Sequence, residues 1–173
     1  TTQRLVLVGC LFGYWALITL VPVPSVLDAG PGATLAAIAP SLDDVRRTLQ
    51  SFVDQAVFGD HIYRKGSYDP EGLLSTIPAL ATCLFGVEAG RVLAAPRELA
   101  GKVRTLLVVG VALMVVGYAW SFALPLNKPL WTSSYAVWTA GIAFAALGAS
   151  VWAFELRGWR ALAHPLQVYG VNA

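Results

Sequence analysis

Charged side chains are scarce in this sequence of 173 residues, of which 13% are charged and 57% are hydrophobic. Soluble domains carry about 25% charged residues, so a soluble globule would lack polar surface, while a disordered chain would leave too much apolar surface unburied. Two cysteines are too few for a disulfide scaffold. The 12 Lys and Arg are scattered among 10 acidic residues, so no basic stripe exists and no nucleic-acid partner is predicted. The class that remains is a membrane protein.

Four apolar stretches are each long enough to cross a bilayer. They cover about residues 5–21, 73–93, 105–124 and 131–154. Only the second contains charged residues, Glu88 and Arg91, and these lie near its end. We therefore predict one all-α transmembrane domain over residues 1–173, a polytopic helical bundle of about four spans in contact with the lipid bilayer.

Small residues within the spans indicate packing. Cys10 and Cys83 are typical of small buried hydrophobic residues, and the spacings of metal ligands are absent, so no metal is predicted. Glycines that allow close helix approach recur in all four spans: Gly13, Gly86, Gly90, Gly110, Gly117, Gly141 and Gly148.

The basic residues in the short connections orient the bundle. If the spans alternate in direction, one side holds Arg4, Arg91, Arg97, Lys102, Arg104, Arg157 and Arg160. Because basic residues are retained on the cytoplasmic side, this side is predicted to be cytoplasmic. The loop 22–70 and the turn 125–131 are then extracytoplasmic.

The loop 22–70 is predicted to contain one amphipathic helix. Its first part, to residue 40, is rich in Gly, Pro and Ala and is expected to be irregular. Ser41 and Asp44 form a capping box, and a helix of about 16 residues follows, with Gly59 as its end. Gln50 and Asp54 fall on the polar face, opposite the apolar side chains. We expect the apolar face to lie on the bundle or at the membrane interface; a direct role in chemistry is the alternative.

The most polar part of this loop lies just before the second span. Asp69 can cap that span, Pro70 suits its first turn, and Glu71 complements the positive end of the helix. The functional alternative is that Glu71 or Asp69 binds or deprotonates a substrate. His61 is either an exposed side chain or a candidate general base, because its ordinary pKa lies near neutrality.

The turn between the third and fourth spans is the second polar region on this side. Asn127 suits a turn, and Trp131 and Tyr135 suit the interfacial aromatic belt. Lys128 is less expected on this face. It could pair with an acidic side chain of the preceding motif or hold an anionic ligand.

The predicted cytoplasmic side contains a basic cluster. Glu88 and Arg91 are three residues apart and can pair on one helix. Arg91, Arg97 and Lys102 would suit a ligand with phosphate groups, although the orientation bias alone also explains them.

Several motifs together resemble one protein family. The run from Asp60 to Tyr63, then 68–77 and 84–91, and the later run 125–135, are similar in order and spacing to the heparan-α-glucosaminide N-acetyltransferase family and its bacterial relatives. Segments 157–159 and 169–172 continue the resemblance, which extends over essentially the whole chain.

This resemblance implies a membrane acetyltransferase that moves acetyl from cytoplasmic acetyl-CoA to an amino sugar of the glucosamine type on the other side of a membrane, here a bacterial inner membrane. The candidate catalytic residues are then Glu71, Asp69 and His61. The candidate substrate-binding residues are Asn127, Lys128, Trp131 and Tyr135, and those for the CoA phosphates are Arg91, Arg97 and Lys102.

The resemblance also implies an incomplete enzyme. Members of the family are longer, and neither His61 nor His164 matches their catalytic histidine, so we expect an internal fragment that is inactive without the remaining helices of the same protein. The alternative functions are a transporter or channel subunit, which the lack of ionisable residues in mid-span disfavours, and a scaffold without chemistry. The acceptor sugar, a homodimeric state and an acetyl-enzyme intermediate stay open.

Overall fold

The computed structural model describes residues 2–24, 37–38, 42, 44–63, 69–159, 168 and 170. Its α-helices are α1 (Thr2–Leu20), α2 (Leu49–Phe58), α3 (Thr76–Ala94), α4 (Leu99–Trp120) and α5 (Ser133–Val151). All but α2 are long and apolar enough to cross a membrane, which confirms the predicted all-helical fold with four spans. Ser41, Tyr68, Arg160 and His164, which the sequence analysis singled out, lie outside the described residues.

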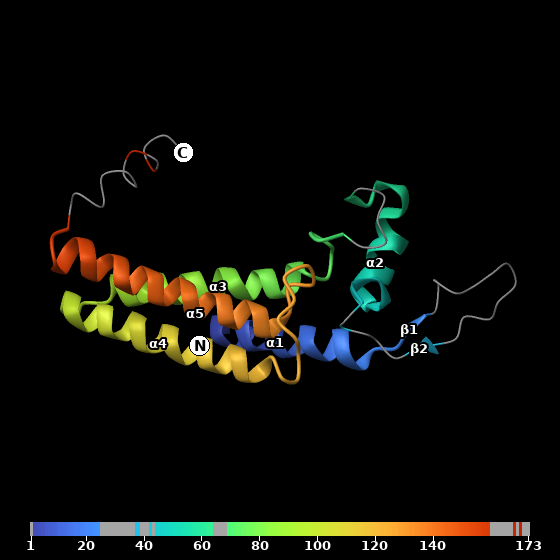
Figure 1. The fold of residues 1–173 in the computed structure, drawn as a ribbon, viewed down its shortest axis with the longest axis horizontal. Helices are drawn as coiled ribbons and strands as arrows, with labels where there is room; N and C mark the ends of the chain where they lie inside the picture. Colours follow the sequence, from blue (N-terminus) through green and yellow to red (C-terminus); the bar gives the residue numbers. More distant parts are fainter. Residues whose placement is uncertain are drawn as a thin grey trace, which may run out of the picture.

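The four long helices lie side by side and alternate in direction, while α2 lies off one end of them (Figure 1). We call the end that carries residues 69–75 and 121–132 the loop end. The opposite end, which carries Arg4, Arg91, Arg97 and Lys102, is called the basic end. The arrangement follows from the short connections, since only residues 95–98 join α3 to α4.

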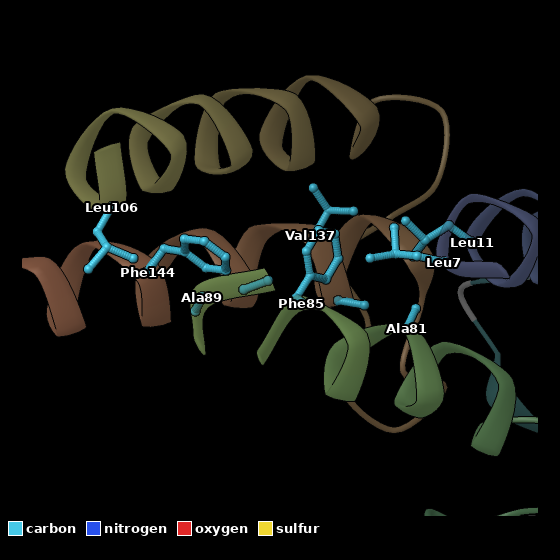
Figure 2. Packing of buried hydrophobic residues seen from close by; sticks show 10 residues of the cluster. Leu7, Leu11, Ala81, Phe85, Ala89, Leu106, Val137 and Phe144 are labelled. Carbon is cyan, nitrogen blue, oxygen red and sulfur yellow. The ribbon is translucent and has the colours of Figure 1, made fainter. Parts of the chain in front are cut away.

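The core forms where all four long helices meet (Figure 2). Leu7 and Leu11 of α1 pack with Ala81 and Phe85 of α3, and α4 and α5 contribute further side chains such as Leu106, Val137 and Phe144. Large apolar side chains also face outward, among them Val108 and Val115 of α4, each 62% exposed. A helix that is apolar on all sides is typical of a membrane span.

The helix ends differ from the predicted spans by several residues. The helix α4 begins at Leu99, so Lys102 lies within it rather than in a link. The helix α5 begins at Ser133, which leaves Trp131 in the preceding turn. After α5 a π-helical turn covers Trp152–Leu156. Hydropathy locates the apolar stretch, but local capping and turn geometry determine where the helix begins and ends.

The first part of the loop 22–70 was predicted to be irregular, but the structure contains two short strands there. The strand β1 (Val23–Pro24) pairs with β2 (Ala37–Ile38) in an antiparallel register that matches Val23 with Ile38. The short helices η1 (Val45–Arg47) and η2 (Gly59–His61) flank α2. Asp44 caps η1 and Thr48 caps α2, so the predicted helix of about 16 residues is wrong in its length and in its cap.

The orientation of α2 also corrects the prediction. Gln50, Ser51 and Asp54 are buried, whereas Val57 is 58% exposed. The buried polar groups find partners in α1 and in residues 69–73, as a buried polar group requires. The polar face of α2 thus packs on the bundle, so the apolar face does not; contact of the apolar face with the membrane interface stays a prediction.

Candidate functional site

The three candidate catalytic residues lie together at the loop end. His61, Asp69 and Glu71 line one open hollow of about 470 Å³, with Tyr63 and Pro70. His61 and Glu71 are exposed. Within the described residues the Glu71 carboxylate makes no hydrogen bond or ion pair, so it is available to a ligand.

Asp69 holds a turn rather than the start of the second span, so the predicted helix cap is wrong. Its Oδ2 accepts from the Tyr63 N–H at 3.2 Å and its Oδ1 from the Glu71 N–H at 2.9 Å. The helix α3 begins at Thr76, after Ser75. A short carboxylate satisfies the backbone two residues ahead, which gives this turn its shape. Asp69 therefore positions Glu71.

The helix α2 anchors this turn through two buried side chains. The Nε2 of Gln50 donates to the Asp69 carbonyl at 3.2 Å, and Asp54 Oδ1 accepts from the Leu73 N–H at 2.9 Å. A Cβ on Gly72 would lie 2.1 Å from Asp54 Oδ2, so the turn requires glycine here. Burial raises the pKa of the Asp54 carboxyl above its usual value, although the bond from Leu73 opposes that shift. Asp54 Oδ2 is buried without a partner among the described residues.

Tyr14 connects α1 to both polar regions of the loop end. Its side chain is fully buried, and its hydroxyl donates to Gln50 Oε1 at 3.0 Å and to the Leu130 carbonyl. The sequence analysis did not identify Tyr14, and it placed Gln50 and Asp54 on the wrong face. A single tyrosine in a span that is otherwise apolar was the available signal, because a buried hydroxyl requires a partner.

The turn before α5 is held by its own side chains. Asn127 Oδ1 accepts from the Leu130 N–H at 3.1 Å, and Thr132 Oγ1 donates to the Pro125 carbonyl at 2.9 Å. Lys128 is exposed, and among the described residues it forms no ion pair, so the expected pairing with an acid is not formed. Asn127 shapes the turn that presents Lys128.

Trp131 and Tyr135 line an apolar groove between α3 and α5, about 560 Å³ in volume, and Asn127 and Lys128 are not among the residues that line it. The indole N–H of Trp131 donates to Thr82 Oγ1 at 3.1 Å, and its ring meets the edge of Tyr135. Trp131 has a φ of 51°, an uncommon backbone conformation for so bulky a residue. The groove continues along α3 past Gly86 and Gly90, where the absent Cβ atoms leave open space.

The predicted phosphate-binding residues also lie together. Arg91, Arg97 and Lys102 line a hollow of about 240 Å³ at the basic end, with Arg4 and Glu88. Glu88 pairs with Arg4 at 2.8 Å and with Arg91, which confirms the predicted Glu88–Arg91 pair. Lys102 Nζ donates to the Leu93 carbonyl at 2.6 Å. The hollow holds four cationic side chains against one carboxylate, an arrangement that suits a polyanion.

The described residues thus define a polytopic helical membrane protein with a polar hollow at each end of its bundle. Among them no three His, Cys, Asp or Glu side chains gather as a metal site would need. The helix α3, which runs between the two ends, has 19 residues and is therefore about 28 Å long.

No family model matches the chain. The sequence is distantly similar to the human heparan-alpha-glucosaminide N-acetyltransferase, with 32% identity over 117 residues, covering 54% of this chain and 17% of the human protein. The mouse protein of the same name is 30% identical over 112 residues, with the same coverage. The chain therefore spans about a sixth of the length of these relatives, and the resemblance is at the level of the family only.

Proposed function

We propose that this chain is part of a membrane-bound acetyltransferase that moves acetyl from acetyl-CoA at the basic end to an amino sugar of the glucosamine type at the loop end. One observation carries the proposal: a single bundle holds carboxylate and imidazole groups in a hollow at one end and a basic hollow at the other. The distant similarity to proteins named as N-acetyltransferases supports the same chemistry.

The distribution of charge supports the sidedness. Arg4, Arg91, Arg97, Lys102 and Arg104 all belong to the basic end, which is therefore proposed to be cytoplasmic, where acetyl-CoA is available. The loop end then faces away from the cytoplasm. We place the protein in a bacterial inner membrane.

Glu71 is the proposed general base. In a direct transfer, the amine of the sugar attacks the thioester carbonyl of acetyl-CoA and forms the new C–N bond, while the C–S bond breaks and its electron pair leaves with the CoA thiolate. Glu71 accepts the proton that the amine loses. Asp69 is less suited because both its oxygens accept backbone bonds, and His61, in the same hollow, is the alternative base.

The basic hollow is proposed to bind the phosphates of acetyl-CoA. Arg91 is already engaged with Glu88, and Lys102 with a backbone carbonyl. Arg97 is exposed, and within the described residues it has no ion pair. Arg97 is thus the cation whose charge is most available for a phosphate.

The separation of the two ends sets a requirement on the mechanism. Because the two hollows lie at opposite ends of the bundle, a thioester bound in one cannot touch an amine bound in the other. Either the acetyl-bearing arm of the substrate extends through the bundle or a protein group carries the acetyl. The apolar groove along α3, from Thr82 to Leu93, follows this direction. Further helices of the same protein would complete the path, since the chain covers 17% of its relatives.

The direct test is the Glu71→Gln variant of the full-length protein in proteoliposomes supplied with acetyl-CoA and glucosamine. Loss of the base should lower acetyl transfer about 100-fold or more. Glu155→Gln is the matched control, because Glu155 is an exposed acid in the π-helical turn that follows α5. Wild-type transfer by the Glu71 variant would overturn the assignment, and solute uptake without acetyl-CoA would favour a transporter instead.

A further inference from the structure

Tyr14 lies where the two halves of the loop-end site meet. Its side chain has no exposed surface, and its hydroxyl lies within hydrogen-bond distance of Gln50 Oε1 and the Leu130 carbonyl. A tyrosine hydroxyl has one proton, so two acceptors share it. Both acceptors would be left buried and unpaired without this hydroxyl, a costly state near an apolar core.

Gln50 extends the first branch to the proposed base. Because its Nε2 donates to the Asp69 carbonyl, the side-chain amide is oriented with Oε1 toward Tyr14. The Asp69 carboxylate then holds the N–H of Glu71. Three hydrogen bonds thus connect the hydroxyl on α1 to the backbone of Glu71.

The second branch reaches the turn before α5. The Leu130 carbonyl accepts from Tyr14, while the Leu130 N–H donates to Asn127 Oδ1. The side chain of Leu130 is fully buried, so this turn is fixed by packing on one side and by the hydroxyl on the other. The positions of Asn127 and Lys128 and the position of Glu71 therefore all depend on one atom, the hydroxyl oxygen of Tyr14.

We infer that Tyr14 and Gln50 are positioning residues that set the separation between Glu71 and the turn 127–131, and that they thereby control binding of the acceptor. This inference rests on the proposed function. A connected buried network specifies one arrangement of the groups that it joins, which apolar packing alone does not do. The basic end lies outside this network, so binding of acetyl-CoA is independent of it.

The kinetic test compares Tyr14→Phe with Tyr118→Phe in the full-length protein. Tyr118 is 58% exposed and lies on α4 in an edge contact with Phe122, so it controls for loss of a hydroxyl alone. Loss of the Tyr14 hydroxyl should raise the KM for the amino sugar about five- to tenfold and change the KM for acetyl-CoA by less than about twofold. An unchanged KM for the sugar, or an equal rise in both KM values, would overturn the inference.

Gln50→Met provides a second variant that keeps the length of the side chain and removes its hydrogen bonds. If Tyr14 acts through Gln50, the double variant should raise the KM for the sugar no more than the stronger single variant. Effects that multiply in the double variant would show two separate roles and contradict the relay. If Tyr14→Phe folds poorly, Gln50→Met alone still tests the inference: it should raise the KM for the sugar and leave the KM for acetyl-CoA unchanged, and an unchanged KM for the sugar would overturn the inference.

A distance measurement separates failure of this inference from failure of the proposed function. Spin labels at Leu73 and Leu126, both exposed, report the separation of the two halves by pulsed EPR in a cysteine-free background. Tyr14→Phe should broaden the distance distribution, and Tyr118→Phe should leave it narrow. If Tyr14→Phe broadens the distribution but the wild-type protein transfers no acetyl, the acetyltransferase proposal is rejected and the positioning role of Tyr14 is supported. If the wild-type protein transfers acetyl but Tyr14→Phe leaves the distribution narrow, the positioning role is rejected.

Discussion

Gly141→Ala should separate α4 from α5, the most closely packed pair of helices. A Cβ at Gly141 would lie 2.5 Å from the Met114 backbone nitrogen and 2.7 Å from the Gly110 carbonyl oxygen. Ordinary contact begins at 3.4 Å, so the helices must move apart locally by about 0.9 Å. Both obstacles are backbone atoms, and no change of rotamer relieves them.

The expected loss of stability follows from two opposing effects. Overpacking of a close contact costs about 1–3 kcal/mol, and alanine returns up to about 1 kcal/mol through its better helix propensity. With an overpacking cost of about 2 kcal/mol, the middle of that range, the net destabilisation is about 1–2 kcal/mol. This corresponds to a thermal midpoint about 2–8 °C lower for a folding unit of roughly 150–250 residues.

The assay is thermal unfolding of the purified full-length protein in detergent at one fixed scan rate. Gly90→Ala is the matched control, because a Cβ there meets nothing within 4 Å among the described residues. Its midpoint should stay the same or rise slightly. The reasoning is refuted if Gly141→Ala unfolds at the wild-type temperature, or if the control loses as much stability.

Three further predictions concern the titration of two aspartates and the basic end. Burial raises the pKa of Asp54, so its contribution to stability is complete below the unfolded pKa of about 3.9 and is lost as the pH rises through the folded value. Asp54→Asn should remove this decline in stability above the unfolded pKa, and parallel curves of midpoint against pH for the variant and the wild type would contradict it. Arg46 lowers the pKa of Asp44, so Asp44→Asn should remove a slope of the opposite sign, since that contribution is lost as the pH falls. Arg97→Gln should raise the KM for acetyl-CoA about tenfold, whereas Arg104→Gln, outside the hollow, should not; equal effects would indicate general charge attraction.

The membrane spans could be read from the sequence because a spanning helix must be apolar over its whole length. The pair Glu88–Arg91 followed from helical spacing alone. The end of the bundle at which each candidate residue lies was also predicted, since alternating spans bring the ends of distant segments to one side; the division of the loop-end candidates between separate hollows was not predicted. Such inferences depend on composition and spacing, which are properties of the chain itself.

The orientation of α2 could not be predicted in this way. Its apolar side chains suggested the packed face, but the structure buries Gln50 and Asp54 because Tyr14 and Leu73 supply their hydrogen-bond partners. Those partners are 36 and 19 residues away in the sequence. A periodic pattern contains no information on such pairings.

The turn residues show the same limit on a smaller scale. Asp69 is a residue type that suits a helix cap, yet it holds a turn that starts seven residues before the first residue of its helix, Thr76. Trp131 suited an aromatic belt, yet it adopts a positive φ and closes against Thr82 of another helix. In both cases a contact from elsewhere in the fold selects one of several local conformations that the residue allows.

The sequence by itself determined that this protein is an all-helical membrane bundle and at which end each side chain lies. The reason is that the hydrophobicity of each stretch defines the spans, and the alternation of the spans in direction assigns each connection to one end. Only the tertiary structure decided which of those side chains are bound by others. Asp69 is held by backbone groups, Glu71 is available, and Tyr14 lies between the two halves of the loop end. Hydrogen bonds are short and directional, so their partners depend on the final positions of segments far apart in the chain.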